Sequence, residues 1–234
     1  MKNTPLERLP ALPYILPFGV FIGLTALAGY LPAGNVWVYP FKTVLTGLLL
    51  IGFWRSYPEI HPNPQNESAT TRTKGFASLL LALIVGLVVF VIWILPDRLG
   101  WQYPLIGESS EFDPDKQFQS ARWLVVWIGF RLFGSAVVVP VMEELFWRSF
   151  LIRYLIRPDF KQVPIGAFSW LSFGATVLLF GVEHHRWLVG LVAGIIYNLL
   201  LYRTKSVFAC IVAHAITNLV LGIYVLVTLQ WAYW

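Results

Sequence analysis

The chain has 234 residues, of which 57% are hydrophobic and only 12% are charged, and its formal net charge is +5. Soluble domains carry about 25% charged residues, so this composition excludes an ordinary soluble enzyme, a disordered chain and a collagen-like fibre. The single cysteine, Cys210, excludes a disulfide scaffold. Basic residues do not cluster with aromatic ones, so no nucleic-acid partner is expected. The composition predicts an α-helical protein that crosses the bilayer several times.

Apolar runs of about 20 residues, the length that crosses a bilayer, recur along the chain with polar breaks between them. They predict spans near 11–31, 36–54, 76–95, 121–157, 164–183, 187–202 and 206–229. The expected fold is an all-α polytopic membrane protein of about seven to eight transmembrane helices, forming one integral membrane domain. Residues 1–120 would supply N-terminal helices and an external acidic loop. Residues 121–234 would supply the last four helices of the bundle.

The loop charges predict the orientation of the chain, because Lys and Arg concentrate on the cytoplasmic side of membrane proteins. Basic residues occupy the loop at 55–75, the segment after the fourth span and the short loop before the last span. The loop at 96–120 is instead acidic, with Asp97, Glu108, Glu111, Asp113 and Asp115. We therefore expect a cytoplasmic N-terminus, an external acidic loop and an external C-terminus.

Charged residues inside apolar runs are costly in a bilayer and are therefore candidates for function. Glu143, Glu144 and Arg148 follow an apolar run. On a helix, Glu144 and Arg148 are i,i+4 neighbours that can pair, whereas Glu143 points about 100° away and has no local partner. A buried carboxylate without a partner is suited to act as a general base near neutral pH. The alternative is a helix end at the interface, with all three charges in water.

Two further polar clusters occur later in the chain. Phe180 and His184 lie at the end of the fifth run, next to His185, where a polar connection with solvated histidines is the simpler interpretation. His214 and Asn218 lie deep in the last run and share one helix face. Both side chains can donate hydrogen bonds. They would either join helices or line a wet cavity.

Three other polar residues lie inside predicted spans. Lys42 and Arg131 are interpreted as structural, because a lysine can extend its ammonium to the interface and Arg131 comes near the external end of a long helix. Asn198 faces into the sixth span and is expected to join helices by a hydrogen bond.

Together the three clusters resemble the intramembrane glutamic endopeptidases of the CaaX-protease and bacteriocin-processing (CPBP) family. That family carries Glu-Glu-x-x-x-Arg, Phe-x-x-x-His and His-x-x-x-Asn in this order, and the sequence carries them at 143–148, 180–184 and 214–218. The resemblance covers about 121–229 and implies that residues 121–234 form a four-helix catalytic core. The C-terminal stretch is also similar to a bacterial, exosortase-associated subgroup, which implies an integral protein of the bacterial inner membrane.

The resemblance implies a role for each motif residue. Glu143, with His184, would activate the attacking water, and His214 and Asn218 would stabilise the oxyanion of the tetrahedral intermediate. The supporting residues would be Glu144, Arg148 and Phe180. The implied activity is an endopeptidase that cleaves a membrane-anchored protein or peptide, CaaX-like or C-terminally sorted, with no cofactor and no metal ion.

The order of the spans raises one difficulty for this site. Strict alternation places Glu143 and His184 near opposite faces of the membrane. They can meet only if the fourth helix is long and tilted, and Pro140 allows a kink just before the site.

Three alternatives remain open. A zinc protease could use Glu143, His184 and His214 as ligands, and sensitivity to a chelator would identify it. A non-catalytic membrane partner or chaperone could keep the same scaffold, and Glu143→Gln would then leave its phenotype unchanged. A proton-coupled transporter also uses carboxylates and histidines, but no inverted repeat is visible and the polar residues gather in one half of the chain.

Overall fold

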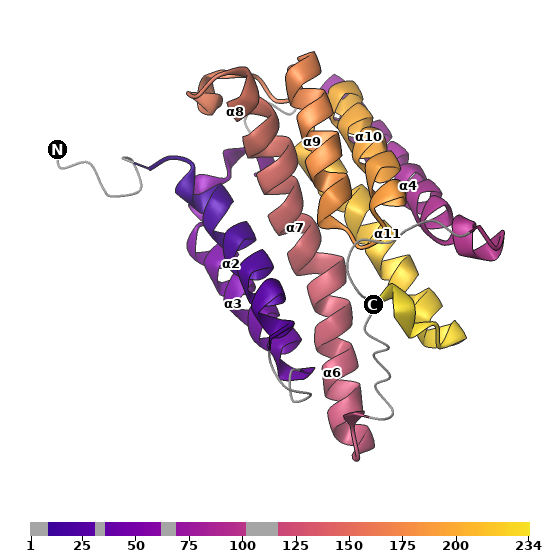
Figure 1. Cartoon of the computed structure of the whole chain (residues 1–234). Helices are drawn as coiled ribbons and strands as arrows, with labels where there is room; N and C mark the ends of the chain where they lie inside the picture. The colour runs from indigo at the N-terminus through magenta and orange to yellow at the C-terminus, as the bar shows by residue number, and fades with distance from the viewer. Residues whose placement is uncertain (1–8, 31–35, 62–68, 102–116) are drawn as a thin grey trace.

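The structure, a computed structural model, describes residues 9–30, 36–61, 69–101 and 117–234 (Figure 1). This part of the chain is built from helices and contains no strand, which confirms the predicted all-α fold. Of the acidic residues in the predicted external loop, only Asp97 is described. The others, Glu108, Glu111, Asp113 and Asp115, lie outside the described residues.

Each of the seven predicted spans corresponds to a helix. The helices are α2 (Leu12–Ala28), α3 (Val38–Gly52), α4 (Ala69–Arg98), a long helix at Ala121–Ile156, α9 (Trp170–Glu183), α10 (Trp187–Thr204) and α11 (Val207–Thr228). Short 3₁₀ turns lie at Trp54–Ser56, Pro58–Ile60, Phe160–Gln162 and Trp231–Tyr233. Within the described residues four helices, α4, the long helix, α10 and α11, are long and apolar enough to cross a membrane, and the other three are shorter apolar helices. The protein is therefore an integral membrane protein.

The long helix is divided by two π-helical segments. It consists of α6 (Ala121–Phe133), α7 (Val139–Glu144) and α8 (Ile152–Ile156), joined by the π-helical segments Gly134–Val138 and Leu145–Leu151. Its 36 residues reach about 54 Å, well beyond the ~30 Å hydrocarbon core. Glu143 and Glu144 are the last two residues of α7, the short α-helical piece between the two π-helical segments. Short π-helical segments within α-helices are frequent at functional sites.

The fifth helix begins later than the sequence predicts. We expected a span from 164, but α9 begins at Trp170. Pro164 opens a turn, Gly166 has a left-handed φ of 72°, and the Ser169 side chain accepts a hydrogen bond from the Ser172 N–H and caps the helix. With 14 residues, α9 is only about 21 Å long and ends part-way along the bundle (Figure 1).

The long helix separates two groups of helices. Figure 1 shows α2 and α3 on one side of it, and α4, α9, α10 and α11 on the other. In the larger group α11 packs on α4 and α10 on α9. Asn198 Nδ2 on α10 donates to Thr176 Oγ1 on α9 at 2.9 Å, which confirms the interhelical hydrogen bond predicted for Asn198.

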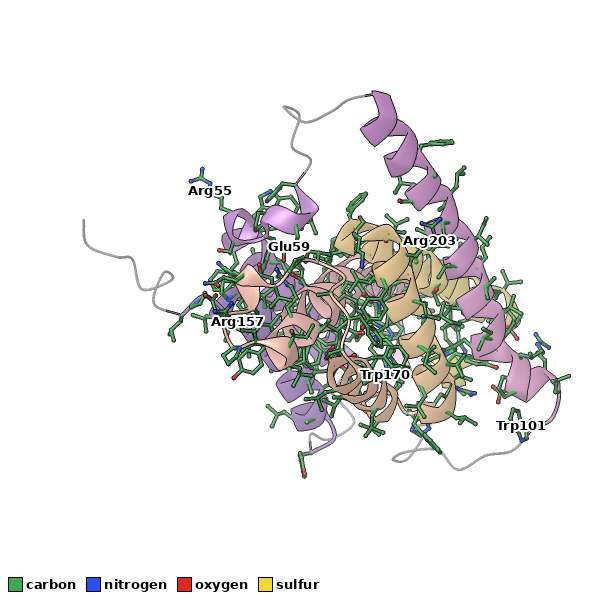
Figure 2. All side chains as sticks on the ribbon, turned by 90° about the horizontal axis from the view of Figure 1, so that it is seen from above. Arg55, Glu59, Trp101, Arg157, Trp170 and Arg203 are labelled. Atoms are coloured by element: carbon green, nitrogen blue, oxygen red, sulfur yellow. The ribbon has the colours of Figure 1, made fainter. Side chains whose placement is uncertain are left out.

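The basic loops gather at one end of the bundle. The ends of α3, α8 and α10 lie at the same end (Figure 1), and Figure 2 shows Arg55, Arg157 and Arg203 spread around its rim. This arrangement agrees with the charge pattern from which the orientation is predicted, and the assignment of this end to the cytoplasm remains a prediction.

Close packing of α4 on α11 depends on Gly86. A Cβ at this position would lie 2.5 Å from the carbonyl oxygen of Ala213 and 2.9 Å from Ile216 Cβ. Gly86→Ala should therefore force the two helices apart and lower the free energy of unfolding by about 1–3 kcal/mol, measured by thermal denaturation in detergent. The matched control is Gly75→Ala in the same helix, where a Cβ meets nothing within 4 Å. Equal melting temperatures for the two variants would contradict this packing argument.

Candidate active site

A cavity of about 270 Å³ lies against the middle of the long helix and is lined by side chains from both groups of helices. All four residues predicted to be catalytic line it, namely Glu143, His184, His214 and Asn218. Phe180 is also part of the wall. The three sequence motifs, which lie up to 75 residues apart, therefore meet at one place.

Glu143 lines this cavity and is almost completely buried, with 5% of its surface exposed. Among the described residues, its Oε2 has no hydrogen-bond partner. Glu144, the next residue on α7, is turned toward a different set of side chains. The expected division between an unpartnered Glu143 and a paired Glu144 is therefore observed.

Glu144 is the centre of a buried polar cluster. Its Oε1 accepts hydrogen bonds from Arg148 Nη1 at 3.0 Å and from His214 Nδ1 at 2.9 Å. This confirms the predicted pairing of Glu144 with Arg148 and excludes the alternative in which these charges are in water. The Arg148 guanidinium also lies 4.4 Å from the centre of the Phe180 ring and 5.3 Å from that of Tyr197, within cation–π range. The cluster thus ties the long helix to α9, α10 and α11.

His184 reaches the cavity because α9 is short. The residue leaves the helix directly after Glu183, and its Nδ1 is 2.7 Å from the carbonyl oxygen of Phe180. A carbonyl only accepts, so Nδ1 carries the proton and Nε2 is left with a free lone pair when the ring is neutral. Trp93 of α4 packs against the ring, with the centroids 5.4 Å apart. Strict alternation of the spans would place Glu143 and His184 near opposite membrane faces. Because α9 is short, His184 instead lines the same cavity as Glu143. A tilt of the long helix alone is not needed to explain this.

Asn218 makes a contact that the sequence analysis did not foresee. In the first π-helical segment the Val139 N–H donates five residues back, to the Gly134 carbonyl. The next donor in that register would be Pro140, which has no N–H. The carbonyl of Ser135 accepts instead from Asn218 Nδ2 at 2.8 Å. Asn218 therefore holds α11 against the π-helical segment while it lines the cavity.

His214 and Asn218 share one face of α11, as predicted, but in the structure they contact different parts of the long helix. His214 contacts Glu144 after the proline, and Asn218 contacts Ser135 before it. Between them, Thr217 on the same helix accepts a hydrogen bond from Tyr197 and donates to the Gly86 carbonyl. These contacts fix the rotation of α11 relative to the cavity.

The turn after His184 is held by the end of α4. Arg186 Nη1 lies 2.7 Å from Asp97 Oδ2, and the Tyr233 hydroxyl also donates to Asp97. Of the two neighbouring histidines, His184 is in the cavity wall and His185 is not, as the spacing from Phe180 indicates.

The cavity also contains charged residues to which the sequence analysis assigned no site role. Glu183 lines it beside His184, and Lys42 and Arg131, interpreted as structural, line it as well. The signal was present in the sequence, since all three are charged residues within or at the end of apolar runs. Within the described ranges, no three His, Cys, Asp or Glu side chains are grouped closely enough to hold a metal ion.

Comparison with known families gives one match. The family model described as type II CAAX prenyl endopeptidase Rce1-like matches residues 122–220. Residues 122–220 are an Rce1-like domain. The Rce1-like domain begins in α6, ends in α11 and contains all seven residues predicted for the site, so the family suggested by the three motifs is confirmed. No curated protein and no solved structure matches the chain.

Proposed function

We propose that this chain is an intramembrane glutamic endopeptidase in which Glu143 is the general base. The family supports a membrane endopeptidase, and the glutamate mechanism is our inference from the cavity. The observation that carries it is the position of Glu143, which is buried and has an unpartnered oxygen among the described residues, in the same wall as His184 and His214. A base of this kind contributes about 10²–10⁴-fold to a hydrolysis rate.

In the proposed reaction Glu143 takes a proton from a water molecule as the oxygen attacks the carbonyl carbon of the scissile peptide bond. The tetrahedral intermediate then breaks its C–N bond, and the leaving amine takes the proton. We expect His184 to pass that proton, because its Nδ1 is occupied by the Phe180 carbonyl and its Nε2 can accept and release a proton. The products are a new carboxylate and a new amine.

The oxyanion would be stabilised by His214 and Asn218. The contact between Nδ1 of His214 and the Glu144 carboxylate fixes the orientation of the imidazole, so that its other edge can interact with the oxyanion. Asn218 uses one amide hydrogen for the Ser135 carbonyl and retains a second. Arg148 and Phe180 act through Glu144 by fixing its position.

The substrate would be a membrane-anchored protein or peptide that reaches the cavity from the bilayer. We place the enzyme in a bacterial inner membrane with the N-terminus and the basic end of the bundle in the cytoplasm, because Lys and Arg favour that side. The N-terminal helices α2 and α3 would complete the cavity wall beside the catalytic core.

The test is peptide hydrolysis by the purified protein in detergent, with a fluorogenic prenylated peptide and mass spectrometry of the products. We expect cleavage at one peptide bond, at the same rate with and without a zinc chelator. Loss of activity in chelator and recovery with added Zn²⁺ would instead assign a zinc protease. Absence of cleavage, together with an unchanged cellular phenotype for Glu143→Gln, would assign a non-catalytic membrane partner.

A further inference from the structure

Two cationic side chains line the cavity on the side of α2, α3 and α6, namely Lys42 and Arg131. Lys42 on α3 is only 7% exposed. Its Nζ donates to Thr25 Oγ1 at 2.6 Å, which uses one of the three N–H groups of the ammonium. The Arg131 guanidinium lies 4.0 Å from the centre of the Tyr39 ring, and Lys42 Nζ lies 4.9 Å from the same point. The two charges are therefore at most about 9 Å apart.

Neither cation is paired with a carboxylate in the part of the chain that the structure describes. Two buried arginines further along the same helix are paired there, since Arg148 contacts Glu144 and Arg153 contacts Glu59. The Nε atom of Arg131 is buried with no hydrogen-bond partner in the described ranges. Aromatic rings offset part of the cost of burying a cation, but a charge inside a membrane protein is costly unless an opposite charge balances it. This part of the cavity therefore favours an anionic ligand.

The level of the two cations along the bundle indicates the kind of anion. A helix of about 54 Å placed symmetrically leaves about 12 Å outside the ~30 Å hydrocarbon core at each end. Arg131 comes ten residues after Ala121, the first residue of the long helix, which is about 15 Å along the axis. Its backbone thus lies only about 3 Å inside the core. Side chains of a helix lean toward its N-terminus, so the guanidinium extends toward the headgroup layer.

Tryptophan side chains mark the same level independently. Trp127 comes one turn before Arg131 and packs against Trp234, with the ring centroids 6.1 Å apart. Trp37 and Trp123, beside the first turns of α3 and α6, pack against each other with centroids 5.6 Å apart. Tryptophan is enriched where the hydrocarbon core meets the lipid headgroups. A phospholipid carries its phosphate in that layer, so a lipid phosphate is the anion within reach of the two cations.

We propose that Lys42 and Arg131 bind the phosphate of an anionic phospholipid in the part of the cavity that faces away from the basic end of the bundle. A phosphate accepts charge-assisted hydrogen bonds from both a guanidinium and an ammonium, and here the donors come from two different helices. A choline headgroup would place a third positive charge beside them, so a lipid without one is favoured. Arg131 and Glu143 are twelve residues apart, about 18 Å along the axis, and the lipid site is therefore separate from the proposed base.

The test measures lipid binding to the protein purified in a neutral detergent, by native mass spectrometry and by melting temperature. We expect one phosphatidylglycerol to bind and to raise the melting temperature, with an affinity about 10-fold higher than that of phosphatidylcholine. Lys42→Met and Arg131→Gln should each weaken the binding of phosphatidylglycerol by about 10- to 100-fold, the usual range for one hydrogen bond to a charged group. Arg131→Lys should lose less, because it keeps the charge. Full binding by the folded Lys42→Met and Arg131→Gln variants would overturn the site.

The matched control is Arg122→Gln, which removes an exposed arginine from the start of the same helix, outside the cavity. This variant should bind phosphatidylglycerol as tightly as the unmodified protein. An equal loss of affinity in Arg122→Gln would show a general attraction of anionic lipid to a basic surface and would overturn the site. Melting temperatures without lipid show which variants keep their fold. If Arg131→Gln does not fold, Lys42→Met and Arg131→Lys decide the result.

Inorganic phosphate distinguishes a lipid from a free anion. We expect a large excess of phosphate neither to raise the melting temperature nor to displace phosphatidylglycerol, because it lacks the acyl chains that contribute to lipid binding. Displacement of the lipid by phosphate in the unmodified protein, but not in Lys42→Met, would assign a site for a free anion and overturn the lipid assignment. Equal affinities for phosphatidylglycerol and phosphatidylcholine would also overturn it. None of these measurements requires hydrolysis, so a protein that binds the lipid but cleaves no peptide would contradict only the proposed peptidase function.

Discussion

Glu143→Gln is expected to lower kcat for peptide hydrolysis by about 10²–10⁴-fold, because a carboxamide cannot take the proton of the attacking water. The substitution preserves the size of the side chain. Within the described residues Glu143 Oε2 makes no hydrogen bond, so little packing or pairing is lost. The melting temperature in detergent should therefore remain close to that of the unmodified protein. Both quantities are measured on the same preparation, with the fluorogenic peptide for kcat.

The matched control for this prediction is Glu183→Gln. Glu183 is a second carboxylate in the wall of the same cavity, next to His184, but it is not part of the three motifs. We expect its replacement to lower kcat by less than about 10-fold, since it would act on the electrostatics of the site rather than on the proton transfer. If Glu183→Gln abolished hydrolysis and Glu143→Gln did not, the base would be Glu183 and the assignment of Glu143 would be wrong.

Glu144→Leu is expected to destabilise the protein by about 3–5 kcal/mol, the usual cost of removing one partner of a buried ion pair. Glu144 and Arg148 are 0% and 1% exposed, so the substitution leaves a guanidinium buried without its carboxylate. It also removes the acceptor of His214 Nδ1. The loss would be measured as a lower melting temperature in detergent and a shift in denaturation by a denaturing detergent.

The double variant Glu144→Leu/Arg148→Met shows whether the buried charge is the cause. Replacement of both partners by apolar side chains of similar size is often neutral or stabilising, so the double variant should regain much of the lost stability. It should remain inactive, because His214 would lack the carboxylate that orients it. A single variant as stable as the unmodified protein would show that the cluster adds nothing to folding.

Hydropathy predicted the positions of the helices largely correctly. Where a predicted helix boundary was wrong, the error has a local cause. The fourth span was predicted at 121–157 and the long helix is Ala121–Ile156. The fifth began six residues late, at Trp170, because Pro164, Gly166 and the Ser169 cap outweigh an apolar composition that extends further back. The pairing of Glu144 with Arg148 was predictable from the i,i+4 spacing, since both residues lie on one helix face.

The sequence by itself determined that this is a helical membrane protein with motifs of the Rce1-like domain at residues 122–220, that Glu144 is paired, and which four polar residues are candidates for catalysis. These features depend on composition, periodicity and spacings within one helix. Only the tertiary structure decided that the short α9 brings His184 into the cavity that Glu143 lines, that Asn218 donates to the Ser135 carbonyl, and that Lys42 and Arg131 line the same cavity. Such contacts join helices far apart in the sequence, and their positions are set by the packing of whole helices rather than by any local pattern.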